Sequence, residues 1–99
     1  MFKNREDFIQ GAKDGLVKEI VLVEYGILDG GDCTTAPHPF RGMKRKISSI
    51  NEQRIGLKGH RGDESFIELD DEETWEFAGH KLTLTTNSTK LTYVINPIM

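Results

Sequence analysis

Apolar and polar residues alternate along most of the chain, as they do in strands with one buried face. The strongest run is 18–25, where Ile20 and Leu22 fall on one face and Val21 and Val23 on the other. A strand with apolar, β-branched residues on both faces is typical of the middle of a sheet that is covered on both sides. The pattern therefore predicts a central strand.

The segment before this strand has helical spacing instead. One narrow stripe collects its apolar side chains: Phe8, Ile9 and Ala12. Asn4 is suited to the N-cap, and Gly15 is suited to the left-handed position that ends a helix. The pattern predicts a short helix over 3–15, which needs a sheet to lie on because so short a helix is marginal alone.

Further alternation predicts a β-hairpin over 43–59 that turns near Asn51 and Glu52. It also predicts three later strands, over 65–69, over 75–77 continuing through Ala78-Gly79 into 80–86, and over 90–95. Segment 26–42 differs, because it holds four glycines and two prolines without periodicity. We expect it to be one long loop, a kind of segment that is usually functional or mobile.

These elements predict an α+β, mainly β fold. An N-terminal helix is followed by a five- to six-stranded, mostly antiparallel curved sheet or small open barrel. The 99 residues suit one domain and are too few for two ordinary ones, so residues 1–99 are expected to form a single domain.

Composition indicates the cellular setting. The first twenty residues lack the run of ~7–15 apolar residues of a signal peptide, and no stretch approaches the ~18 needed to span a membrane. The single cysteine, Cys33, excludes an intrachain disulfide framework. We expect a cytoplasmic protein that does not associate with membranes.

Charge is segregated along the chain, although the net charge is only −3. Segment 41–61 holds seven basic side chains and one acidic. If the apolar residues of the hairpin point inward, the strand pleat sends four cations outward together: Lys44, Lys46, Arg54 and Lys58. Arg45 is the exception, and it has to snorkel or sit at an edge.

This outward face, with His38 and Arg41 of the adjoining segment, is the candidate ligand-binding site. A two-stranded basic ribbon can hold the phosphates of a nucleotide or of a nucleic-acid segment. The alternative is a solvated outer surface, because exposed lysines also protect sheet edges from aggregation. The acidic balance, with a sequence pI near 5.6, argues against a dedicated duplex binder.

Segment 63–76 has the opposite composition, with eight acidic side chains and none basic. Its densest run is the candidate partner-binding surface: Asp70, Asp71, Glu72 and Glu73. This predicts, as an alternative function, a protein-interaction or inhibitor module of the phage or mobile-element accessory type that meets a basic partner. A polar connection between strands explains the run equally well. The two opposed patches also allow a homo-oligomer built head to tail.

Recognised chemistry is absent from the sequence. The histidines and Cys33 lack the spacing of metal ligands, and neither a phosphate-binding loop nor a dinucleotide-binding motif occurs. No order of residues indicates a catalytic triad. The sequence therefore predicts a small non-enzymatic binding module without a metal or a cofactor, which holds an anionic ligand.

Overall fold

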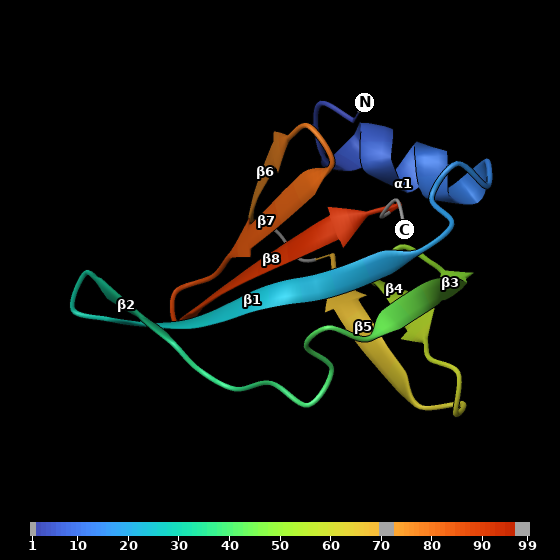
Figure 1. Ribbon diagram of the computed structural model, residues 1–99. Helices are drawn as coiled ribbons and strands as arrows, with labels where there is room; N and C mark the ends of the chain where they lie inside the picture. Colours follow the sequence, from blue (N-terminus) through green and yellow to red (C-terminus); the bar gives the residue numbers. More distant parts are fainter. Residues whose placement is uncertain (1, 70–72, 97–99) are drawn as a thin grey trace.

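The computed structural model describes residues 2–69 and 73–96 and shows one helix on one antiparallel sheet of eight strands (Figure 1). The elements follow one another along the chain as α1 (Arg5–Lys13), β1 (Ile20–Asp29), β2 (Asp32–Thr35), β3 (Lys44–Ile50), β4 (Arg54–Lys58), β5 (Glu64–Glu68), β6 (Thr74–Ala78), β7 (Lys81–Thr85) and β8 (Thr89–Ile95). The mainly β class is confirmed, and the expected five to six strands were too few.

The sheet has the order β5-β4-β3-β1-β8-β7-β6, and β2 pairs with β1 outside this path. Strand β1 lies in the middle of this path, as the sequence predicts for 18–25. Ile20 and Leu22 are buried on one face, whereas Val21 and Val23 on the other face are half-buried, so the expected full cover on both sides is not seen. In the described part of the chain β5 and β6 stand at opposite ends of the path and do not pair, so the sheet is not closed.

The expectation of one long loop over 26–42 was wrong. Strand β1 continues to Asp29, and Gly30 and Gly31 turn the chain so that Asp29 pairs with Asp32. Both glycines have positive φ, 58° and 93°, which is the conformation of the two-residue turn favoured in β-hairpins. Figure 1 shows β2 extending away from the rest of the sheet. The irregular segment is therefore confined to 36–43, which we call the 36–43 loop.

This turn supports a first prediction. Gly31→Val should lower the free energy of unfolding by about 1–2 kcal/mol, because a β-branched residue is strained at positive φ. Gly30→Asn is the matched control, since asparagine tolerates the left-handed conformation and the φ of Gly30 lies within it. Urea denaturation of both variants measures the difference. Equal losses in the two would contradict the turn geometry.

The helix α1 begins and ends where its sequence signals predict. The side-chain oxygen of Asn4 accepts a hydrogen bond from the backbone N–H of Asp7 at 2.8 Å, and Gly15 follows the helix with φ 77°. Phe8 is fully buried and carries the apolar face into the core, beside the aromatic rings of β6. Figure 1 shows α1 over one end of the sheet, next to β6 and β7.

Candidate functional site

The hairpin β3–β4 carries the predicted basic face. Lys46 and Lys58 are direct partners across the two strands, and both are exposed. Their neighbours Ile47 and Leu57 form the next pair and belong to or pack against the core, so the lysines point outward. Lys44 precedes Lys46 by two residues and shares its side of β3. We call Lys44, Lys46 and Lys58 the lysine cluster.

Arg54 lies apart from this cluster, at the other end of β4. It pairs with Glu68 of β5, and its guanidinium carbon lies 4.4 Å from the centre of the Phe66 ring. Lys58 likewise has an acidic partner on its β5 side, Glu64. The structure therefore does not bring the four predicted cations into one group. It also places carboxylates of β5 beside the cations of β4.

Arg45 neither snorkels nor sits at an edge, which corrects the expectation from the sequence. It is only 2% exposed, and its Nη1 donates to Asp63 Oδ2 at 2.6 Å. Its Nη2 donates to the carbonyl oxygens of Leu57 and Asp63 at 3.1 and 2.9 Å. The ring of Phe40 lies 4.0 Å from its guanidinium carbon. An inward-pointing arginine is tolerated because a carboxylate, two carbonyls and an aromatic ring replace water around it.

His38 and Arg41 hold the 36–43 loop against the sheet rather than joining the lysine cluster. The Nδ1 of His38 accepts a hydrogen bond from the backbone N–H of Phe40 at 3.2 Å. The centres of the His38 and Tyr25 rings lie 5.0 Å apart. Burial, together with the charge of Arg45, lowers the pKa of His38, so its neutral form is favoured. Arg41 is exposed, and its Nε donates to the carbonyl of Val23 at 3.2 Å.

The predicted partner-binding run falls largely outside the described residues, which exclude Asp70, Asp71 and Glu72. Glu73 is described and is half-buried. Two other acidic residues of the same segment, Glu64 and Glu68, lie beside the basic hairpin on β5. Acidic residues of segment 63–76 and basic residues of segment 41–61, separate in the sequence, therefore pair directly in the sheet at these two positions.

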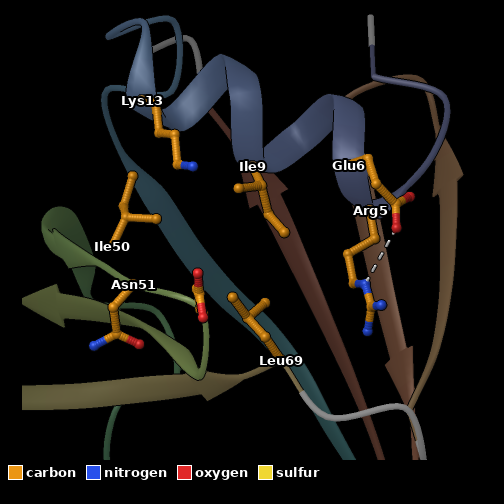
Figure 2. A pocket seen from close by; sticks show the side chains of 8 residues that line it. Arg5, Glu6, Ile9, Lys13, Ile50, Asn51 and Leu69 are labelled. Atoms are coloured by element: carbon orange, nitrogen blue, oxygen red, sulfur yellow. Dashed lines mark ion pairs between the residues drawn. The ribbon is translucent and has the colours of Figure 1, made fainter.

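Apolar side chains line part of two of the hollows beside the hairpin. Figure 2 shows one of about 290 Å³ between α1 and the β3–β4 turn, where Ile9, Ile50 and Leu69 form an apolar floor. Arg5 and Glu6 stand at its rim, with Arg5 Nε and Glu6 Oε1 3.8 Å apart. The other, about 150 Å³, lies on the inner side of β3 beneath the 36–43 loop, and Arg45 and Tyr93 line it.

The described residues contain no group of three histidine, cysteine or acidic side chains placed to hold a metal ion. No helix in the described ranges is long and apolar enough to cross a membrane.

Sequence reasoning missed three residues around Arg45: Phe40, Asp63 and Tyr93. Asp63 was counted with the acidic run, and nothing local ties it to a residue 18 positions earlier. The alternation did carry one signal, since it placed Arg45 on the inward face, where a guanidinium that stays buried needs a counter-charge.

The fold and these sites define a small, mainly β protein in which one helix covers one end of an open antiparallel sheet. Comparisons of the chain with protein-family models, with curated proteins and with solved structures find no match.

Proposed function

We propose that this protein is a non-enzymatic binding module that holds an anionic ligand, a nucleotide or a segment of nucleic acid, on the lysine cluster. The observation that carries the proposal is the direct pairing of two exposed lysines, Lys46 and Lys58. Like charges directly opposite each other destabilise an antiparallel pair. A phosphate placed between them removes that repulsion and releases the counter-ions that otherwise screen it.

The surroundings set the strength of this binding. Lys44 extends the cluster along β3, and Arg61 stands in the turn that follows Lys58. Glu64 opposes these cations from β5, and the net charge of the chain is −3. A few phosphate contacts are therefore favoured over a long track, so we expect modest affinity that falls as salt is added.

The test is fluorescence polarisation of a labelled single-stranded oligonucleotide at several salt concentrations, with unlabelled nucleoside triphosphate as competitor. Lys46→Glu/Lys58→Glu should weaken binding at least about tenfold and should flatten the dependence on salt by about 0.7 for each phosphate that the variant no longer neutralises. If the nucleotide displaces the oligonucleotide, the ligand is a nucleotide. If it does not, the ligand is a segment of nucleic acid.

Lys81→Glu/Lys90→Glu is the matched control for this experiment. Both lysines are exposed, lie on β7 and β8, and give the same change in net charge. This control should lose much less affinity than the Lys46/Lys58 variant. Equal losses in the two variants, or no binding by the wild-type protein at low salt, would overturn the proposal.

A further inference from the structure

The pocket beneath the 36–43 loop lies on the opposite side of β3 from the lysine cluster. Leu22, Leu57 and Leu91 supply its apolar walls. Phe40 and His38 of the loop also line it. Its volume of about 150 Å³ matches an apolar cavity of about 150 Å³ known to hold benzene. The space therefore fits a single six-membered ring.

Two side chains in the wall of this pocket carry hydrogen-bond donors, Arg45 and Tyr93. Arg45 Nε is buried and lacks an acceptor in residues 2–69 and 73–96, although the two Nη atoms of the same side chain are bonded. The hydroxyl of Tyr93 belongs to a side chain that is 8% exposed. Buried polar groups are nearly always hydrogen-bonded, because an unmade bond costs about 1–3 kcal/mol. A ligand in the pocket that carries an oxygen acceptor would accept a hydrogen bond from the Tyr93 hydroxyl.

Electrostatics favours an uncharged ligand over an anion in this pocket. The charge of Arg45 is already matched by Asp63, and His38 is held towards its neutral form. Burial, with the negative charge of Glu73, raises the pKa of Tyr93 to about 12, so its hydroxyl keeps its proton and remains a donor. A carboxylate on the ligand would be repelled by Asp63 and Glu73 and would compete with Asp63 for Arg45.

We propose that this pocket binds one small, uncharged, planar ring that carries an oxygen acceptor, with the ring against the three leucines and the oxygen towards the hydroxyl of Tyr93. This site differs from the lysine cluster in position, in charge and in the ligand that it takes. It stands independently of the proposed anion binding.

Titration with three probes of similar size tests the inference. Binding is monitored through the NMR signals of the methyl groups of Leu22, Leu57 and Leu91. Benzamide offers a ring and an oxygen acceptor, toluene offers the ring alone, and benzoate adds a charge. Benzamide should give saturable shifts and bind about threefold to tenfold more tightly than toluene, which is the range expected for one net hydrogen bond. Benzoate should bind more weakly than benzamide.

Two variants separate the role of the hydroxyl from the role of the space. Tyr93→Phe keeps the ring and should reduce the affinity for benzamide to that for toluene. Ser65→Met lengthens a side chain of the pocket wall and should weaken both neutral probes. Lys46→Glu/Lys58→Glu should leave benzamide binding unchanged, which keeps the result distinct from that of the anion site.

The inference is overturned if benzamide produces no saturable shifts, if benzoate binds more tightly than benzamide, or if Tyr93→Phe binds benzamide as well as the wild type does.

Discussion

Phe8→Ala should lower the free energy of unfolding by about 3–5 kcal/mol, the range for removing a buried phenylalanine ring. Phe8 is fully buried, and its ring centre lies 5.4 Å from that of Phe2, 5.9 Å from that of Trp75 and 6.0 Å from that of Phe77. Because a domain of this kind has a total stability of about 5–15 kcal/mol, the loss is a large fraction of the whole. The loss is large because the Phe8 ring packs α1 against the aromatic rings of β6.

Phe66→Ala is the matched control, because it removes the same atoms from an exposed position. Phe66 of β5 is 42% exposed, and its ring contacts Arg54. Its removal should cost less than about 1 kcal/mol, the range of an exposed cation–π contact. Urea denaturation followed by the fluorescence of Trp75, the one tryptophan in the sequence, measures both variants. Similar costs for the two substitutions would show that α1 is not anchored through Phe8.

The parts of the fold that local sequence signals determine were predictable. Asn4 and Gly15 bound the helix as expected, since a capping oxygen and a glycine at positive φ act on their immediate neighbours. Strand β1 was predictable because its apolar residues fill both faces. In both cases the residues that decide the structure lie within a few positions of the element itself.

The extended hairpin β1–β2 was missed for a physical reason. The glycines at 26–31 were interpreted as signs of irregular backbone, although Gly30 and Gly31 supply the two positive φ angles of a tight turn. Pairing also stabilises this region from the other side, where Ile27 lies opposite Thr89 of β8. A partner 62 positions away leaves no signal near Ile27 in the sequence.

The candidate site was predictable only in the part that strand alternation determines. Alternation placed Lys46 and Lys58 on one outward face, and the strand register agrees. It could not predict that Glu64 and Glu68 of β5 lie next to the hairpin cations, because that depends on which strand pairs with β4. Nor could it identify the pocket, which forms only when the 36–43 loop lies against the sheet.

The ion pair between Arg45 and Asp63 should behave asymmetrically when either partner is removed. Arg45→Met keeps an unbranched side chain in the core and should cost about 1–3 kcal/mol, because hydrogen bonds to a charged group are removed while its desolvation is relieved. Asp63→Ala should cost more, since it leaves a guanidinium that is 2% exposed without its counter-charge. The carboxylate, by contrast, is 31% exposed and can be hydrated when it stands alone.

A double-mutant cycle with pH as a second variable tests this pair. The double variant Arg45→Met/Asp63→Ala should cost less than the sum of the single variants. The hydrogen bond from Arg45 lowers the pKa of Asp63, so the carboxylate contributes its full stability above the unfolded-state pKa of about 3.9. That contribution is lost as the pH falls from there through the lower folded-state pKa. Urea denaturation between neutral pH and about pH 2 should therefore show that acid lowers the free energy of unfolding of the wild type. The decrease should be smaller in Asp63→Ala. If the costs of the single variants add up to that of the double variant, and the wild type and Asp63→Ala depend on pH in the same way, the two charges are not coupled.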